Sequence, residues 1–243
     1  MRLDKFMSEA GLLSRKETAK AVSRGEITVN GAVVKKADTK INEETDAVSY
    51  RGERVAYHPF VYVMLNKPAG YISATEDGHA PVVTELLDEV LRKRGLFPCG
   101  RLDKDTTGLM ILTDDGGLSH LLLSPKRHVA KTYAFTLDKP LPAGAEDRFL
   151  SGVMLGDELC KPASLCLEEG RDAGTICLTE GKYHQIKRMM LSEGATVVTL
   201  SRTSFATIPL DEGLAPGEWR YLNQEEIKIL QEAPYGQKEK EVK

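Results

Sequence analysis

The sequence predicts an α+β protein with two domains, a small N-terminal domain and a large domain with a mixed, mostly antiparallel sheet. The chain of 243 residues, 41% of them hydrophobic, is long enough for one large and one small domain. Strand patterns outnumber helix patterns, and the helices do not alternate strictly with strands as a parallel α/β fold requires. The pattern of apolar residues also changes near residue 58, close to a proline.

Residues 1–58 are expected to form the small domain, with two short helices followed by a hairpin. Apolar residues recur at helical spacing over residues 2–10. Ser14 and Glu17 have the spacing of a capping box and announce the second helix. The pair Asn30-Gly31 between alternating apolar residues predicts a type I′ turn, because both turn positions require a positive φ.

Residues 59–232 are expected to form the large domain, and residues 233–243 have the composition of a disordered tail. Apolar and β-branched runs predict strands at 61–67, 109–115, 131–137, 173–181, 196–202, 205–210 and 218–222. Helical periodicity predicts helices at 82–94, 116–124, 183–194 and 223–233.

Charge and cysteine content exclude several classes of protein. The net charge of -3 argues against a protein that coats nucleic acid along its whole surface. Residues 1–40 nevertheless hold nine Lys or Arg against five Asp or Glu, a local excess of positive charge. The four cysteines form no CxxC pair and the five histidines are scattered, so neither a metal site nor a disulfide framework is expected.

Membrane insertion is also not expected. No stretch approaches the roughly 18 uninterrupted apolar residues that a membrane span needs. The N-terminal segment mixes charges into its apolar pattern, so it does not have the pattern of a secretory signal. We therefore expect a cytoplasmic protein.

The stretch GRLDKDTTGL, residues 100–109, concentrates polar residues between two apolar segments. A surface turn, with Asp103 or Asp105 capping the backbone, is one interpretation. The apolar flanks favour a second, in which Asp103 lies in a partly enclosed site and needs a partner for its charge. The helix in GKYHQIKRMM offers Lys187 as that partner, unless its basic residues only form a solvated face.

A third stretch, SPKRHVAKTY, places Lys126, Arg127 and Lys131 before Tyr133 on a predicted strand. A tyrosine on a strand is often a core residue. Basic residues interleaved with an aromatic ring are also typical of sites that bind a phosphate backbone and stack on a base. Both interpretations remain open from this pattern alone.

These three stretches, in this order and preceded by LNKPAGYIS, resemble the pseudouridine synthases, in the branch that modifies ribosomal RNA and carries a small N-terminal domain. GRLDKDTTGLMILTDDG is similar to the catalytic motif of that family, KTY to its second motif and GKYHQIKRMM to its third. The N-terminal helices and the Asn-Gly hairpin resemble the S4-type RNA-binding module. The resemblance covers residues 1 to about 232.

The resemblance implies roles for four residues. Asp103 matches the catalytic aspartate, Tyr133 the residue that stacks on the target base, Lys187 the cation that pairs with the aspartate, and Leu200 an apolar residue of the pocket wall. Candidate contacts to the RNA backbone are the basic residues near the site and in the second N-terminal helix, namely Arg101, Lys126, Arg127, Lys131, Arg15, Lys16, Lys20 and Arg24.

The implied reaction converts uridine to pseudouridine in ribosomal RNA. It breaks the bond from C1′ to N1 and joins C1′ to C5, so no atoms are gained and neither a redox cofactor nor a metal is expected. Asp103 could attack C1′ or C6, or act as a base at C2′, and the sequence does not choose among these. Within the family, the resemblance is strongest to the enzymes that modify uridine 516 of 16S ribosomal RNA. It is carried by the stretches LLSPKRHVAKTY, LCKPA and LAPGEWRYL. The expected partner is then small-subunit RNA or an assembly intermediate, bound by a monomer.

Three alternatives are weighed against this function. The first is a large-subunit synthase of the same family, and the second is an RNA-binding assembly factor without activity. The third is a glycoside hydrolase that uses Asp103 and Asp105 as its carboxylate pair, which would release free uracil.

The other polar residues have structural interpretations. Asp114 and Asp115 are interpreted as a turn and helix cap. Cys99 and His184 are interpreted as structural, and Lys67 as a loop residue that could contact RNA.

Overall fold

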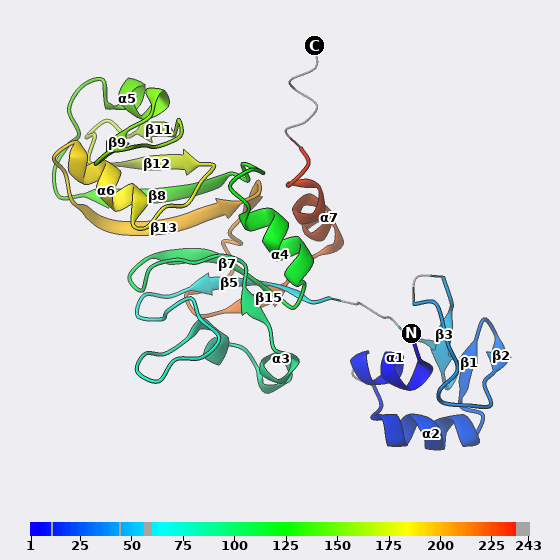
Figure 1. Ribbon diagram of the computed structural model, residues 1–243. Helices are drawn as coiled ribbons and strands as arrows, with labels where there is room; N and C mark the ends of the chain where they lie inside the picture. Colours follow the sequence, from blue (N-terminus) through cyan, green and yellow to red (C-terminus); the bar gives the residue numbers. More distant parts are fainter. Residues whose placement is uncertain (11, 44, 56–59, 237–243) are drawn as a thin grey trace, which may run out of the picture. The chain divides into compact units, whose positions relative to one another are not determined.

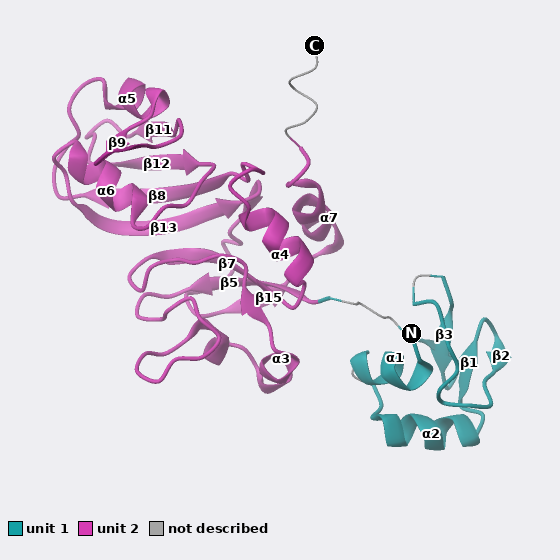
Figure 2. Cartoon of the chain, viewed as in Figure 1, with its two compact units in different colours: residues 1–60 teal, residues 61–243 magenta. Residues whose placement is uncertain are grey.

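The structure is a computed structural model of the chain that describes residues 1–10, 12–43, 45–55 and 60–236. The chain divides into two compact units, Met1–Phe60 and Val61–Lys243 (Figure 2). The predicted boundary at residues 58 and 59 lies outside the described residues. In the described part of the chain, no helix is long and apolar enough to cross a membrane.

The N-terminal unit packs two helices and a small antiparallel sheet around a core of its own. The strand order in the sheet is β2-β1-β3-β4. The elements are α1 (Leu3–Glu9), α2 (Arg15–Ser23), β1 (Ile27–Val29), β2 (Ala32–Val33), β3 (Val48–Tyr50) and β4 (Glu53–Arg54).

Local signals determine most of this unit. The Ser14 hydroxyl accepts a hydrogen bond from the backbone N–H of Glu17, and the Glu17 carboxylate accepts one from the N–H of Ser14, so the predicted capping box is present. Asn30 and Gly31 both have a positive φ, 52° and 79°, as the predicted hairpin requires. A second hairpin, β3–β4, was not predicted; Arg51 and Gly52 make its turn, again with a positive φ at both positions.

The C-terminal unit has helices on both faces of a nine-stranded sheet (Figure 1). Its helices are the 3₁₀ helix η1 (Val83–Leu86), α3 (Glu89–Arg94), α4 (Gly116–Leu123), α5 (Ala145–Ser151), α6 (Gln185–Ser192) and α7 (Gln224–Glu232). Its sheet strands are β5 (Tyr62–Lys67), β6 (Phe97–Pro98), β7 (Thr107–Thr113), β8 (Lys131–Leu137), β11 (Ser164–Leu167), β12 (Ala173–Leu178), β13 (Val197–Phe205), β14 (Ile208–Pro209) and β15 (Trp219–Tyr221). A separate hairpin joins β9 (Met154–Leu155) to β10 (Glu158–Leu159).

The strand order is β11-β12-β8-β13-β7-β5-β15, with β14 paired to β13 and β6 to β7. The pairing of β13 with β7 is parallel, and the other pairings among the described strands are antiparallel. The mixed, mostly antiparallel sheet predicted from the sequence is therefore confirmed. The parallel pair brings the middle of β13, at Ser201 and Arg202, beside the start of β7, where the polar stretch 100–109 enters the sheet.

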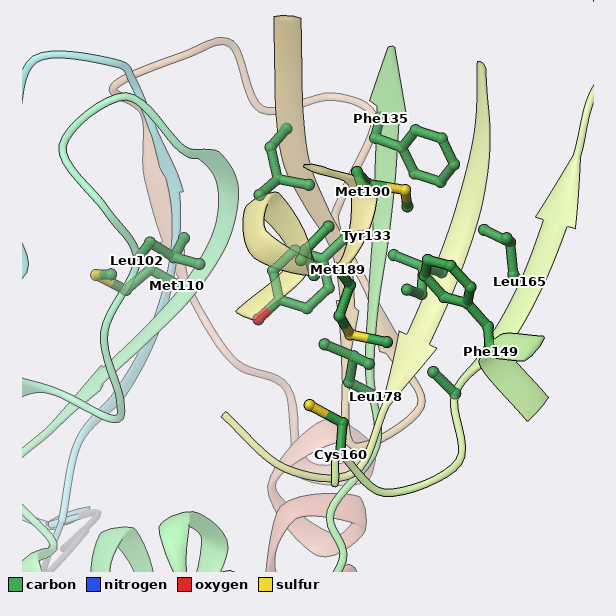
Figure 3. Packing of buried hydrophobic residues seen from close by; sticks show 14 of the residues in the cluster. Leu102, Met110, Tyr133, Phe135, Phe149, Cys160, Leu165, Leu178, Met189 and Met190 are labelled. Carbon is green, nitrogen blue, oxygen red and sulfur yellow. The ribbon is translucent and has the colours of Figure 1, made fainter. Parts of the chain in front are cut away.

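Central strands of this sheet are buried on both faces, which explains their continuous apolar runs. Along β7, Leu109 and Ile111 belong to the core under α4 and α7, whereas Met110 and Leu112 belong to the core on the opposite face. Figure 3 shows part of this second core, in which Tyr133 lies among apolar side chains of the sheet and of α6.

The structure differs from the predicted elements at several points. The single helix predicted over 82–94 is two short helices, because Leu87 is extended and buried and Asp88 caps α3 by accepting a hydrogen bond from Leu91 N–H. The short elements β6, β9, β10, β11 and α5 were not predicted. Residues 233–236 of the expected tail form a turn after α7, and 237–243 lie outside the described residues.

Candidate active site

A pocket of about 650 Å³ opens in the C-terminal unit where the polar stretch 100–109 meets α6 and the first residues of β8. Its residues come from segments far apart in the sequence, namely 72–73, 100–106, 123–125, 131–133, 178–187 and 200–202. The volume lies in the range of sites that enclose a small molecule, and a single nucleotide is of that size. All three polar stretches singled out in the sequence analysis thus contribute to one cavity.

The pair Asp103 and Lys187 lies in this pocket. Lys187 Nζ is 3.0 Å from Asp103 Oδ2 and 2.6 Å from Asp105 Oδ1, so one ammonium binds both carboxylates of the stretch. The Asp103 side chain is about one-third exposed, and that of Asp105 is mostly exposed. The structure therefore brings together the residues that the resemblance paired, and it adds Asp105 as a second partner of the lysine.

Opposing effects act on the pKa of Lys187. Partial burial lowers it, but the hydrogen bonds to Asp105 and Asp103 together raise it more, so the net pKa lies above 10.5. The hydrogen bond from Lys187 lowers the pKa of Asp105 below its usual 3.8, against a smaller effect of burial. The ammonium and the Asp105 carboxylate are therefore both ionised at neutral pH.

His184 was interpreted as a structural residue of the motif helix, and the structure places it beside Asp103. It lies at the N-cap of α6 with a left-handed backbone, φ 47°. This conformation places its Nε2 3.5 Å from Asp103 Oδ1, on the opposite oxygen from Lys187. Its ring also stacks on the largely exposed ring of Tyr183, with 3.8 Å between centroids. A left-handed residue at a helix start has no signal in the helical periodicity, so the sequence analysis missed it.

Tyr133 and Leu200 form part of the pocket wall. In the β8–β13 ladder Tyr133 lies opposite Arg202, and Leu200 lies opposite Phe135. Residues two apart on a strand share a face of the sheet, so Tyr133, Leu200 and Arg202 all face the same side. The two apolar residues are each less than a tenth exposed, and Figure 3 shows the Tyr133 hydroxyl at the edge of its apolar surroundings.

Lys67 was considered as an RNA contact, and the structure contradicts this. It is fully buried, and its ammonium donates hydrogen bonds to four backbone carbonyls, those of Pro68, Asp103, Lys104 and Thr106. Burial lowers the pKa of Lys67 to about 8, although the nearby carboxylates of Asp105 and Asp103 oppose the shift. The residue holds the backbone from Asp103 to Thr106 in place against the end of β5.

The predicted contacts to the RNA backbone fall into three groups. Arg101, which is exposed, and Lys131, which is partly buried, line the pocket. Lys126 and Arg127 do not, and the Arg127 guanidinium lies 5.2 Å from the Tyr235 ring centroid, against the turn after α7. The four predicted contacts in the N-terminal unit lie on the exposed surface of α2 or at its end: Arg15, Lys16, Lys20 and Arg24.

The remaining polar features are structural. Asp115 caps α4 by accepting a hydrogen bond from Leu118 N–H, and Asp114 accepts one from Val61 N–H, so the predicted turn and cap are present. Cys99 is fully buried, and burial raises the pKa of its thiol. Within the described residues no group of three or more His, Cys, Asp or Glu side chains is placed to hold a metal ion.

Replacing Lys67 with Met should destabilise the protein by at least about 3 kcal/mol, because four carbonyls around Asp103 lose their shared donor. Urea unfolding of K67M measures this. The matched control is K104M in the same loop, where the side chain is exposed and the change should stay within about 0.5 kcal/mol. Equal midpoints for K67M and the wild type would contradict the role assigned to Lys67.

Replacing Lys187 with Met should raise the pKa of Asp105 towards 3.8, because the hydrogen bond that lowers it is lost. In the wild type the stability that this shift contributes is fully present above pH 3.8 and is lost as the pH falls through the lower folded-state pKa. NMR titration of the carboxyl carbons measures the pKa of Asp105 in the wild type and in K187M. Asp77 is the internal control, because its pKa is lowered by the backbone N–H groups of His79 and Ala80 and should not change. A shift of Asp77 with no shift of Asp105 would contradict the assignment.

Comparisons with known proteins agree with this geometry. Residues 61–192 match the RNA pseudouridylate synthase family, and residues 1–47 match the S4 domain. The solved structure titled "Crystal structure of pseudouridylate synthase" superposes with a TM-score of 0.67 at 38% identity, over 95% of this chain and 99% of the other.

Curated relatives match over almost the whole chain. "Ribosomal small subunit pseudouridine synthase A" of Salmonella typhimurium is 43% identical over 230 residues, which are 93% of this chain and 98% of the relative. The Escherichia coli K12 protein of the same name is 42% identical with the same coverage. "Uncharacterized RNA pseudouridine synthase YtzG" of Bacillus subtilis is 41% identical over 96% of this chain and 99% of the relative. With its own site geometry in agreement, the chain belongs to the RNA pseudouridylate synthase family, which are isomerases, and carries an S4 domain at its N-terminus.

Proposed function

We propose that this protein converts a uridine of small-subunit ribosomal RNA to pseudouridine, at uridine 516 of 16S RNA, with Asp103 as the catalytic group and without a cofactor. The observation that carries the proposal is the contact of Asp103 with Lys187 in a pocket that Tyr133 also lines. The ribosomal target is supported by the names of the Salmonella and Escherichia relatives. Ribosomal RNA as substrate also fits the cytoplasmic location that we expect.

The chemistry requires little beyond a positioned carboxylate. The bond from C1′ to N1 breaks, the uracil turns within the pocket, and C5 bonds to C1′, so the product has the atoms of the substrate. An Asp103 oxygen would attack C1′ or C6, or remove the proton at C2′. Lys187 and His184 contact different oxygens of this carboxylate and would fix its orientation in each route.

The target uridine has to leave its stack to enter the pocket, at a cost of a few kcal/mol. Stacking of the uracil on Tyr133 would offset part of that cost and would retain the base while it is detached. Arg101 at the exposed edge of the pocket would bind a flanking phosphate. The exposed basic residues of α2 would add further phosphate contacts.

Replacing Asp103 with Asn should abolish pseudouridine formation and leave RNA affinity within about twofold, because the amide keeps the shape but cannot act as nucleophile or base. Single-turnover assays with purified D103N and filter-binding measure the two quantities. The control is D157N, an exposed position in the β9–β10 turn, which should behave as the wild type. Retained turnover by D103N would refute the assignment.

The target is tested by carbodiimide primer extension across ribosomal RNA from cells with and without the gene. Loss of the signal at uridine 516, restored by the wild type and not by D103N, is expected. Loss at a large-subunit uridine would instead support the other branch of the family. No change at any ribosomal site would favour an RNA-binding factor, and release of free uracil in vitro would indicate a hydrolase.

Neutralising the basic surface of α2 should weaken RNA binding more than it slows the bound reaction. With all four residues replaced by Gln, R15Q/K16Q/K20Q/R24Q, the slope of log K against log salt should decrease by up to about 3, since each phosphate contact contributes about 0.7 to 0.9. Binding isotherms at several salt concentrations and single-turnover rates at saturating enzyme measure the two effects. A slower bound reaction with unchanged affinity would contradict this role.

A further inference from the structure

Two buried polar atoms of the described residues have no hydrogen-bond partner, Thr106 Oγ1 and Arg202 Nη2. Both residues line the pocket. A buried donor without a partner costs about 1–3 kcal/mol, so proteins seldom retain one without a use for it. Their joint location indicates that the missing partner is a ligand in the pocket.

Arg202 is held through Nε, and its Nη2 is buried without an acceptor. The residue is 1% exposed, and its Nε donates a hydrogen bond of 2.6 Å to the carbonyl of Leu109 on β7. This bond fixes the plane of the guanidinium, while Nη2 has no acceptor. Arg202 also lies directly opposite Tyr133 in the β8–β13 ladder, next to the wall on which the target base would stack.

Lys131 supplies a second cation in the same part of the pocket. Its Nζ lies 5.6 Å from the Phe205 ring centroid, and the guanidinium carbon of Arg202 lies 5.3 Å from the same centroid. Burial lowers the pKa of Lys131 to about 8, and the charge of Arg202 contributes to this shift. Among the described residues Lys131 forms no ion pair with a carboxylate, and its Nζ donates a hydrogen bond to the carbonyl of Val129. Two cations arranged in this way suit a ligand with negative charge.

The RNA has two groups to which these cations could bind, a backbone phosphate and the target base. The burial of the cations distinguishes between the two. A phosphate remains with the sugar backbone at the entrance, where Arg101 and Lys104 are exposed. Arg202, by contrast, is almost fully buried and adjoins Tyr133. A uracil stacked on Tyr133 would lie next to Arg202, and both of its carbonyl oxygens are acceptors.

We propose that Arg202, together with Lys131, binds the carbonyl oxygens of the target uracil and stabilises the negative charge that the ring acquires during the reaction. When the bond from C1′ to N1 breaks, its electron pair stays on uracil and spreads over N1, O2 and O4. Attack at C6 instead moves electrons to O4, so the ring carries charge in either case. The charge is consumed when C5 bonds to C1′; the C5 proton is then lost and N1 gains one.

The proposal rests on pseudouridine formation, and it does not depend on which uridine is the target. Removing one such donor from a charged intermediate typically slows a reaction about 10²-fold or more. Lys131 is the better residue to change first, because it is partly exposed and its loss is less disruptive than that of Arg202. The matched control is Lys139, which is exposed, follows β8 and does not line the pocket.

The experiment measures cleavage of the glycosidic bond in a single turnover, using a ribosomal RNA fragment that the wild type modifies. K131M and R202K should cleave uridine on the order of 10²-fold more slowly. The same fragment with 5-fluorouridine at the target should show a smaller loss, because fluorine makes the detached base more acidic and less dependent on protein cations. K131R should restore most of the rate, and K139M should match the wild type.

Two results would overturn the proposal. Equal losses with uridine and 5-fluorouridine would indicate a structural role only. Weaker RNA binding, with a decrease of about one in the salt slope and an unchanged bound rate, would indicate a phosphate contact. If R202K does not fold, K131M and K131R still decide the matter. A wild type that modifies no ribosomal fragment would instead refute the proposed function, which is a separate outcome.

Discussion

The buried ammonium of Lys67 is the contact on which the site depends. Lys67 lies at the end of β5, where it pairs with Gly108 in the sheet, and its ammonium binds the carbonyls of Asp103, Lys104 and Thr106. Other contacts also hold this loop, because the Ser73 hydroxyl bonds to the backbone of Leu102 and the N–H of Gly70 donates to the carbonyl of Lys104. Fixing the carbonyl of Asp103 also restricts where its carboxylate can lie, and Lys187 and His184 then restrict its orientation.

The parallel pairing of β7 with β13 is the second constraint. It requires a glycine at 108, where φ is 94° and a Cβ would overlap the backbone of Arg202. The close approach lets Arg202 reach the carbonyl of Leu109, 93 residues earlier in the chain. One sheet therefore carries Tyr133, Leu200 and the buried guanidinium of Arg202 on a single face, next to the loop that holds Asp103.

Charge is distributed unevenly within the pocket. Near the aspartate, one lysine is shared between two carboxylates, so opposite charges balance. Near Tyr133, Lys131 and Arg202 lie together, and within the described residues Lys131 forms no ion pair with a carboxylate. An isomerisation that detaches a base would use both halves: the carboxylate would serve as nucleophile or base, and the cations would face the ring that receives the electrons.

The sequence by itself determined the fold class, the capping box, the Asn-Gly hairpin and the positions of Asp103, Tyr133 and Lys187 in their motifs, because these depend on residues close together in the chain. Only the tertiary structure decided that Lys67 is buried, that His184 is left-handed beside Asp103, that Arg127 packs on Tyr235, and that Arg202 faces the pocket. Each of these depends on strand register or on a contact between distant segments, and hydrophobic periodicity carries no information about either.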